Sequence, residues 1–467
     1  MIIEQIYTGC LAQGAYYIES EGEVAIIDPL REVQPYIDKA ANAQAEIKYI
    51  FETHFHADFV SGHITLSQKT NAPIVFGPEA NPSFDAIIAT DGQSFQLGKL
   101  TIIALHTPGH TIESTTYLLK DESGRDLAIF SGDTLFLGDV GRPDLAQKSA
   151  NMTMEDLAGM LYDSLRNKIM PLSDDVLVYP AHGAGSACGK KMMKETIDTL
   201  GNQKAVNYAL RSDMTKAEFI REVTDGLLPP PAYFPHNVKM NKEGYDSIDE
   251  VLLKGKQGLK PQAFEDVVNE TGAIVLDVRH QNDFAKSHIP RSIFIGLSGN
   301  FAPWVGELIK DVHQKIVLVV DEDQLDEAIT RLSRVGFDQI LGYLQGGIDS
   351  WVAAGKATDS VKSISAATFA DIIGGDPVSK PIVDVRKVAE YEANHILDAK
   401  NFPLSQLNHY ISVFPNQEEV FIHCAGGYRS MIASSILKSR GIHNLVDVAG
   451  GFKSIVKVGI PLVAEVV

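Results

Sequence analysis

Short apolar runs alternate with amphipathic stretches through the C-terminal half of the chain. Residues 274–276 and 316–320 are aliphatic, largely β-branched runs, residues 340–344 are a further strand candidate, and residues 325–335 show the apolar spacing of a helix. Strands and helices in alternation are typical of a parallel sheet that is covered by helices on both faces. We therefore predict α/β structure with parallel sheets in this half.

The N-terminal half has a different pattern. Apolar residues 15–18 and 24–27 flank a Glu-Gly turn at residues 21–22, which predicts two paired strands. Further along the chain, strand-like segments are each followed by a loop that contains a histidine or an aspartate. This pattern predicts an α/β sandwich in which loops at strand ends hold a site.

The C-terminal half repeats itself at the length of a whole domain. Asp277 in a Leu-Asp-Val-Arg segment recurs as Asp384 in Val-Asp-Val-Arg, 107 positions later, and His288 recurs as His395 at the same interval. A Gly-Gly pair also recurs after 104 positions. Solenoid units are shorter than this, so we interpret the repeat as a duplicated domain.

A proline-rich connector separates the duplicated half from the N-terminal half. Four prolines fall within residues 226–235, where they remove backbone donors and disfavour a helix. We expect an extended connector there and place the domains at residues 1–245, 246–360 and 361–467.

Composition narrows the class of protein. The 467 residues are 45% hydrophobic and 22% charged, as in globular proteins, and the net charge is −19. Such a charge repels phosphates and anionic lipids, so we expect neither a nucleic-acid nor a membrane partner. Three cysteines are too few for a disulfide framework, and the first 30 residues contain no basic residue. We therefore expect a cytoplasmic protein, and a homo-oligomer because dimers are the commonest assembly.

Candidate metal ligands follow several predicted strands of the N-terminal half. His54 and His56 lie two positions apart, so they project to the same side of an extended segment, and Asp58 follows them. Three further segments place a His or Asp beside a glycine, which lets the backbone come close, at His110, Asp133 and His182.

Together these segments resemble the metallo-β-lactamase superfamily over residues 1–245, which implies an αββα sandwich. That superfamily usually carries His-x-His-x-Asp-His and binds two metals, but the last position here is Phe59. A phenyl ring cannot ligate a metal. This departure weakens the interpretation as a dinuclear glyoxalase II and favours a single metal.

Within that superfamily, the persulfide dioxygenases bind one iron through two His and one Asp. The resemblance implies that His54, His110 and Asp133 bind one Fe(II) per chain. Two imidazoles and one carboxylate leave open coordination positions, as in non-haem iron enzymes that activate O₂, although the same ligands accept zinc. Three further residues would orient ligands and substrate by hydrogen bonds: His56, Asp58 and His182.

Cys188 follows His182 by six positions and precedes the run of residues 190–200, which we predict to be helical. A cysteine at a helix N-terminus beside Lys190 and Lys191 should have a lowered pKa and be nucleophilic. We therefore consider Cys188 a possible sulfur acceptor near the iron, the alternative being an inert small side chain.

Residues 419–437 predict a strand, a tight loop and an amphipathic helix, with Cys424 at the strand end. The helix N-terminus and Arg429 add positive potential that stabilises a thiolate or a persulfide. Paired glycines permit positive φ, so the backbone N–H groups of the loop can turn towards the sulfur. The residues of this persulfide loop are Ala425, Gly426, Gly427 and Tyr428.

Together with Asp384, Glu390 and His395, this loop resembles a rhodanese (sulfurtransferase) domain over residues 361–467. Tyrosine phosphatases place five residues between Cys and Arg, whereas four intervene here, so phosphatase activity is the weaker alternative. Residues 246–360 resemble a second rhodanese fold in which Asp321 takes the position of the cysteine. The acidic loop after Asp321 would repel sulfite or thiosulfate, so we expect this copy to be inactive, as a spacer or a dimer contact.

The order of domains resembles bacterial fusions of a persulfide dioxygenase with a degenerate and an active rhodanese domain. That resemblance implies iron-dependent oxidation of a small thiol persulfide by O₂ to sulfite and thiol. Cys424 would carry sulfur to or from thiosulfate. A zinc thioester hydrolase of the glyoxalase II type fused to a sulfurtransferase is the alternative, and a scaffold protein would leave both sites unexplained.

Overall fold

The structure, a computed structural model, describes residues 1–147, 151–227, 229–375, 380–415 and 417–464. Its contacts divide the chain into two compact units. The first unit comprises Met1–Ile248 with Leu332–Gly336, and the second comprises Asp249–Arg331 with Phe337–Val467. Within the described ranges, no helix is both long enough and apolar enough to cross a bilayer.

The first unit contains two six-stranded sheets. The strands of one sheet, in spatial order, are β1 (Ile2–Thr8), β2 (Gln13–Ser20), β3 (Glu23–Ile27), β4 (Glu46–Phe51), β5 (Ile74–Phe76) and β6 (Ile87–Ile88). The strands of the other, from the opposite edge, are β7 (Ser94–Leu97), β8 (Leu100–His106), β9 (Thr115–Lys120), β10 (Asp126–Gly132), β11 (Leu177–Pro180) and β12 (Asp198–Thr199).

Alternation along the strands builds the core between the two sheets. Tyr16 and Ile18 of β2 belong to the apolar cluster that joins the sheets, together with Tyr117 and Phe130 of the second sheet. Tyr17, between Tyr16 and Ile18, points to the outer face and packs in a separate cluster. Because successive side chains of a strand face opposite ways, each sheet is buried on both faces.

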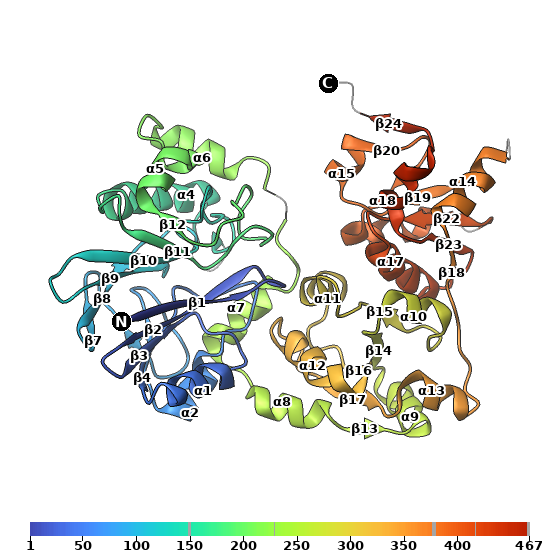
Figure 1. The fold of residues 1–467 in the computed structure, drawn as a ribbon, viewed down its shortest axis with the longest axis horizontal. Coiled ribbons are helices and arrows are strands. Elements are labelled where there is room, and N and C mark those ends of the chain that lie inside the picture. Colours follow the sequence, from blue (N-terminus) through green and yellow to red (C-terminus); the bar gives the residue numbers. More distant parts are fainter. Residues whose placement is uncertain (148–150, 228, 376–379, 416, 465–467) are drawn as a thin grey trace. The chain divides into compact units, whose positions relative to one another are not determined.

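Helices cover the two outer faces of this sandwich, so the layers run helix, sheet, sheet, helix (Figure 1). α1 (Gln34–Asn42) packs its buried Tyr36 and Ala40 on the first sheet, where α2 (His63–Thr70) also lies. α4 (Met154–Ser164) and α6 (Lys216–Thr224) pack on the second sheet, which α5 (Leu200–Val206) also borders. The predicted αββα sandwich is confirmed, and so is the predicted pairing of β2 with β3.

The second unit contains two five-stranded parallel sheets with the same strand order. The strands of one are β13 (Gly258–Leu259), β17 (Ile340–Leu344), β16 (Ile316–Val319), β14 (Ile274–Asp277) and β15 (Ile293–Phe294). Those of the other are β18 (Lys362–Ile364), β23 (Leu445–Val448), β22 (Val420–His423), β19 (Ile382–Asp384) and β21 (Lys400–Asn401). A short antiparallel pair, β20 (Asn394–Ile396) with β24 (Leu462–Ala464), accompanies the second sheet.

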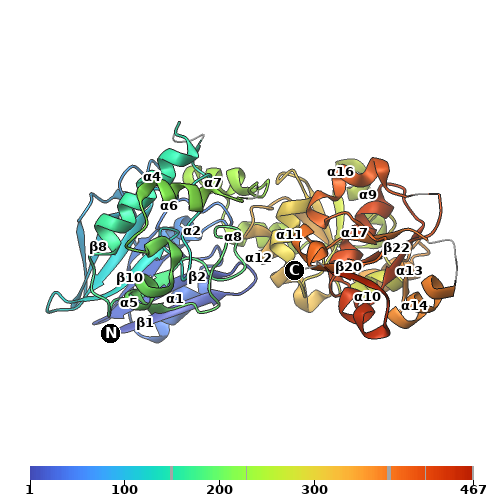
Figure 2. The same ribbon diagram turned by 90° about the horizontal axis from the view of Figure 1, so that it is seen from above.

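Helices flank both sheets of the second unit. The first copy has α9 (Pro261–Thr271), α10 (Gln281–Lys286), α11 (Phe301–Leu308), α12 (Leu325–Ser333) and α13 (Gly347–Ala353). The second has α14 (Ala366–Gly375), α15 (Val388–Ala393), α16 (Leu407–Tyr410), α17 (Tyr428–Ser439) and α18 (Gly451–Ile455). The central helix α17 packs on β22 and β23 (Figure 2).

The prediction of an extended connector over residues 226–235 is wrong at its C-terminal end. α7 (Phe234–Glu243) begins there, with Pro235 in its first turn. Proline is favourable at this place because its fixed φ suits the helix and its missing N–H would have no helical partner. Residue 228 lies outside the described residues, and α8 (Ile248–Gly255) follows α7. The domain limits at 245 and 360 stay predictions.

The position of Gly109 should not tolerate any other residue. Its φ is +142°, and a Cβ there would lie 2.4 Å from the backbone of Leu161 in α4. We expect Gly109→Ala to lower the melting temperature of the metal-free protein by roughly 5 °C or more, since overpacking against backbone adds to the backbone strain. Gly124→Ala is the matched control, because Gly124 also has a positive φ of +83° but open space around it. Equal losses in the two variants would contradict the argument.

Candidate metal centre and cysteine site

The predicted metal ligands meet where strands of both sheets end. His54 follows β4, His110 follows β8 and Asp133 follows β10 directly. The Nε2 atom of His110 lies 3.3 Å from an Asp133 carboxylate oxygen, and that of His54 lies 3.9 Å from the same oxygen. All three side chains are at most 2% exposed. Their ligand atoms lie within 4.8 Å of one another, close enough to bind one metal ion.

The carboxylate of Asp133 fits a cation at this place. Neither of its oxygens accepts a hydrogen bond from an N–H or O–H group of the described residues, although the residue is only 1% exposed, and the Cys188 thiol lies beside it. A buried carboxylate without a partner is strongly unfavourable unless a positive charge compensates it. The residues present therefore fit a bound metal ion, and Asp133 would be its anionic ligand.

Hydrogen bonds on the outer side of the rings orient both histidines. His110 donates from Nδ1 to the Arg142 carbonyl at 2.8 Å, which leaves Nε2 free to face Asp133. His54 Nδ1 lies 3.0 Å from the Thr53 hydroxyl, and Thr53 in turn donates to Asp28. Burial lowers the pKa of His54 well below its usual value, so this imidazole is neutral and able to ligate a metal.

A second group of predicted residues lies beside this cluster. His182 Nε2 is 3.5 Å from Asp58 and 3.6 Å from Asp133, so Asp133 borders both groups. His56, Asp58 and His182 are also close enough together to hold a cation. The Phe59 ring is fully buried and lies 4.4 Å from the ring of His56, in place of a further histidine.

Two buried acids behind His56 escaped the sequence analysis. His56 Nε2 lies 3.1 Å from Asp28 and 3.5 Å from Glu52. Burial lowers the pKa of His56, but the charges of Asp28 and Glu52 outweigh burial and raise it to about 9. Asp28 follows β3 directly and Glu52 follows β4 directly, and this position after a strand was the signal available in the sequence.

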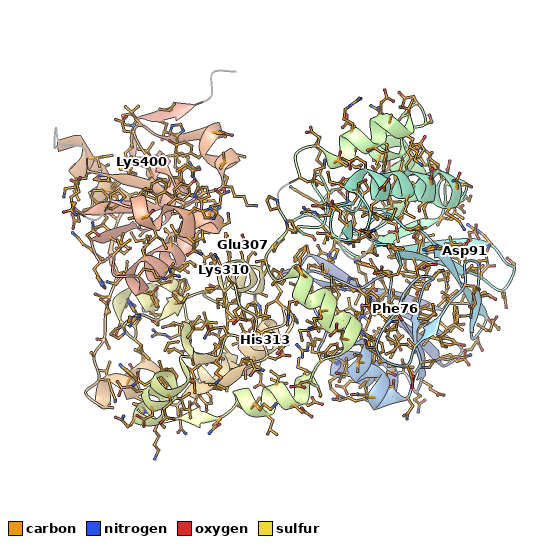
Figure 3. The ribbon with its side chains drawn as sticks, turned by 180° about the vertical axis from the view of Figure 1, so that it is seen from behind. Phe76, Asp91, Glu307, Lys310, His313 and Lys400 are labelled. Carbon is orange, nitrogen blue, oxygen red and sulfur yellow. The ribbon has the colours of Figure 1, made fainter. Side chains whose placement is uncertain are left out.

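Aromatic packing fixes the loop that carries His54 and His56. Phe55, between them, lies against Phe76 of β5 with ring centroids 4.7 Å apart. Phe76 is buried within the first unit (Figure 3). The side chain that points away from the metal cluster thus secures the two that face it.

The cysteine site in the second unit is built as predicted, from strand, loop and helix. Cys424 follows β22, and α17 begins four residues later at Tyr428. Gly427 has a φ of +99°, and its N–H donates to the Cys424 sulfur over 3.1 Å. Gly451 has no room for a side chain, since a Cβ there would lie 2.3 Å from the Cys424 carbonyl oxygen.

Arg429 lies in the first turn of α17 and is paired with Glu390. The two side chains form a bidentate ion pair with hydrogen bonds of 2.6 and 2.9 Å. The hydrogen bond from Arg429 holds the pKa of Glu390 at about 2. Glu390 therefore stays ionised at neutral pH, and its charge offsets part of the positive potential that Arg429 provides at the sulfur.

Comparison with known proteins assigns both units to families. The profile of the metallo-beta-lactamase superfamily matches residues 8–182, and that of the rhodanese-like domain matches residues 260–354 and 365–457. A probable hydroxyacylglutathione hydrolase of Schizosaccharomyces pombe is 32% identical over 198 residues, which are 42% of this chain and 72% of that protein. The chain belongs to the metallo-beta-lactamase superfamily. It also carries two rhodanese-like domains.

Two further relatives of this metallo-beta-lactamase protein are informative. The mitochondrial persulfide dioxygenase of Homo sapiens is 28% identical over 221 residues, which are 47% of this chain and 78% of that protein. A crystal structure titled as a metallo-beta-lactamase from Staphylococcus aureus is 30% identical. The match covers 74% of this chain and 98% of the Staphylococcus aureus chain, with a TM-score of 0.64.

The structure contradicts our expectations about the surroundings of Cys188 in the metallo-beta-lactamase domain. No helix follows it directly: α5 starts only at Leu200, so Cys188 has no helix N-terminus to lower its pKa. The residue is 1% exposed and lies near Asp133 and His182. Burial, with added effects from Asp58 and Asp133, raises its pKa well above the usual value. Its role as a sulfur acceptor stays a prediction.

In the first rhodanese-like domain, the prediction that Asp321 takes the position of the cysteine is wrong by one residue. Asp277 pairs with Val319 of β16 as Asp384 pairs with His423 of β22, so Val320 stands where Cys424 stands in the second copy, and Asp321 follows it. Residues 322–324 then form a short 3-10 helix, and Asp321 to Asp323 are all exposed. An acidic, solvent-exposed turn therefore replaces the loop that surrounds a sulfur in the second copy. The expectation that this copy lacks the cysteine chemistry is consistent with that turn.

Replacement of Asp133 should reveal two separate effects. One is the destabilisation of the metal-free protein by the buried charge, and the other is the stabilisation that metal binding gives. Metal-free Asp133→Ala should melt at the same temperature as the metal-free wild type or higher, because a buried unpaired charge is gone. The wild type should gain roughly 5 °C or more on loading with Fe(II) or Zn(II), and the variant should gain nothing. Differential scanning calorimetry with and without metal measures both effects.

The control for this experiment is Asp213→Ala, since Asp213 is 80% exposed and should leave both temperatures unchanged. A metal-free Asp133→Ala that melts well below the wild type would show that Asp133 is satisfied without a cation.

Proposed function

We propose that the first unit is an iron-dependent dioxygenase of a low-molecular-weight thiol persulfide. The overall reaction is R–S–S⁻ + O₂ + H₂O → R–SH + SO₃²⁻ + H⁺. The observation that carries this proposal is the buried cluster of His54, His110 and Asp133, together with the Phe59 ring that packs against the neighbouring His56. Two imidazoles and one carboxylate form the ligand set typical of mononuclear iron oxygenases, and iron bound in this set would supply the activation of O₂.

The residues around the cluster have defined tasks in this proposal. Thr53 and the Arg142 carbonyl hold the rings of His54 and His110 in the ligating orientation. His182 faces the site with an Nε2 atom that has no hydrogen-bond partner among the described residues, so it can bind a persulfide anion or supply a proton to the thiol product. Near-complete burial of these side chains excludes bulk water from the site.

The second unit would process the sulfur. In our proposal Cys424 accepts the outer sulfur of a persulfide and, as Cys–S–S⁻, transfers it to sulfite. The sulfite–sulfur bond forms, the Cys424 sulfur–sulfur bond breaks, and the products are thiosulfate and the Cys424 thiolate. The same steps in reverse would take sulfur from thiosulfate. The hydrogen bond from the Gly427 N–H supports this reading, because it stabilises a negatively charged sulfur.

A thioester hydrolase is the second candidate, and one observation favours it. The hydroxyacylglutathione hydrolase of Schizosaccharomyces pombe is 32% identical, against 28% for the human persulfide dioxygenase. Phe59 argues against the hydrolase. Because a phenyl ring replaces a histidine there, the group of His56, Asp58 and His182 has one ligand fewer than the second metal site of a dinuclear enzyme of this superfamily.

Oxygen uptake on a metal-quantified sample decides between the two candidates. Protein loaded anaerobically with Fe(II) should contain about one iron per chain and consume O₂ when a small persulfide is added. His110→Ala should retain little iron and lose at least about 100-fold in O₂ uptake, because one ligand is missing. Zinc in the protein as isolated, with thioester hydrolysis and no O₂ uptake after iron loading, would contradict the proposal.

The proportion of sulfite to thiosulfate among the products distinguishes the reaction at the metal site from the reaction at Cys424. Cys424→Ser should leave O₂ uptake within about twofold of the wild type, because in the proposal the persulfide substrate reacts with O₂ at the metal site of the first unit. Sulfite should then accumulate where the wild type forms thiosulfate, and ion chromatography of the reaction mixture measures both anions. Val413→Ala is a suitable control, since Val413 is 66% exposed in the same half of the second unit. Thiosulfate as the main product of Cys424→Ser would refute the division of labour.

A further inference from the structure

The pocket at Cys424 is built by both rhodanese-like domains of the second unit. It has a volume of about 300 Å³. From the C-terminal domain come Cys424, Tyr428, Arg429 and Lys387, and from the preceding domain come Asn300 and Trp304. Asn300 immediately precedes α11, and Trp304 lies within that helix. A domain without a cysteine of its own thus supplies one wall of the other domain's site.

Contacts at the base of this wall tie it to the cysteine loop. The Tyr428 hydroxyl donates to the Gly296 carbonyl over 2.7 Å. The Tyr428 ring lies flat against Gly299, where a Cβ would come within 2.3 Å of the ring. Arg331 of α12 donates to the Leu297 and Gly299 carbonyls and so holds this segment in place. The wall therefore has a fixed position relative to the sulfur.

The pocket is larger than an inorganic sulfur anion requires. About 300 Å³ is the space of roughly ten water molecules, whereas thiosulfate has five heavy atoms. Trp304 is half-buried and offers an apolar ring, which thiosulfate cannot use. Pockets of this size with an aromatic wall and a few polar groups are typical of sites for organic molecules.

The charges of the pocket favour an anion on that organic molecule. Arg429 is paired with Glu390, so its charge is offset in part. Lys387 also lines the pocket, is exposed, and forms no ion pair with any described residue. Asn300 adds an exposed amide that can donate hydrogen bonds to a carboxylate or a peptide carbonyl.

We propose that the degenerate rhodanese-like domain is the substrate-recognition half of the Cys424 site. Trp304 and Asn300, with Lys387, bind the organic part of a carboxylate-bearing thiol persulfide, and the inorganic anion is the smaller co-substrate. This inference rests on the proposed sulfur transfer at Cys424 and names its donor class. The Cys424 thiolate attacks the outer sulfur of R–S–SH, the sulfur–sulfur bond of the donor breaks, and RS⁻ leaves with the electron pair. The product is Cys424–S–SH, so atoms and charge balance.

Donor selectivity tests the proposal under anaerobic conditions, where the dioxygenase cannot act. The full-length protein transfers sulfur to cyanide from glutathione persulfide or from thiosulfate, and kcat/KM is measured for each donor. Trp304→Ala and Asn300→Ala should each lower the ratio of glutathione persulfide to thiosulfate, by at least tenfold for Trp304→Ala. Leu253→Ala is the matched control, because Leu253 is 79% exposed in the same unit away from the pocket lining. An unchanged ratio in both pocket variants would overturn the proposal.

Binding gives a readout that does not depend on turnover. The chain has two tryptophans, and Trp351 is 4% exposed in an apolar core, whereas Trp304 lines the pocket. Glutathione added to Cys424→Ser should quench tryptophan fluorescence saturably, and the additional Trp304→Phe change should remove that quenching. Saturable quenching without sulfur transfer from either donor in the wild type would refute the proposed chemistry and retain the binding site. Transfer from both donors without quenching would refute the binding site and retain the chemistry.

Discussion

Asp133 places a carboxylate in the interior of the first unit, where no N–H or O–H group of the described residues donates a hydrogen bond to either oxygen, and the candidate ligands are arranged about that charge. His54 and His110 face it from two other strand ends, and their outer nitrogens are held by a hydroxyl and a carbonyl. A carboxylate in such a place is costly unless a cation joins it. The sandwich therefore positions the candidate metal site, and a metal ion bound there would compensate the charge that the fold has buried.

Phe59 and the acids behind His56 decide how far this site departs from a dinuclear one. The aromatic ring occupies the place where the superfamily usually has a further ligand, and it packs on the face of His56. Asp28 and Glu52 lie within 3.5 Å of the His56 Nε2 atom, which therefore faces these two carboxyl groups. In the proposed function, both effects lessen the capacity of the His56, Asp58 and His182 group to hold a second ion, and the single metal is assigned to His54, His110 and Asp133.

The second unit contains two rhodanese-like domains, and only the second of them has a cysteine at the end of its β22 strand. Both copies retain the same parallel strand order, and each has a buried Asp–Arg pair at the end of the corresponding strand, β14 in the first copy and β19 in the second. In the first copy an acidic turn stands where the cysteine loop should be. The segment that leads into α11 instead packs against Tyr428 and forms a wall of the other copy's pocket.

The sequence by itself predicted the strand–helix alternation and the duplication, because hydrophobic period and repeated motifs can be read along the chain. The resemblance to the metallo-beta-lactamase superfamily supplied the αββα sandwich and the candidate ligands. The run after Cys188 misled because its composition permits a helix, whereas tertiary contacts hold Lys190 and Lys191 by their backbone N–H groups on the buried Asp139. Only the tertiary structure could show that no N–H or O–H group of the described residues donates to Asp133, that Asp28 and Glu52 flank His56, and that Trp304 reaches the pocket of Cys424. Those facts depend on distances between residues far apart in the chain, and such distances are fixed only when the sheets and helices pack.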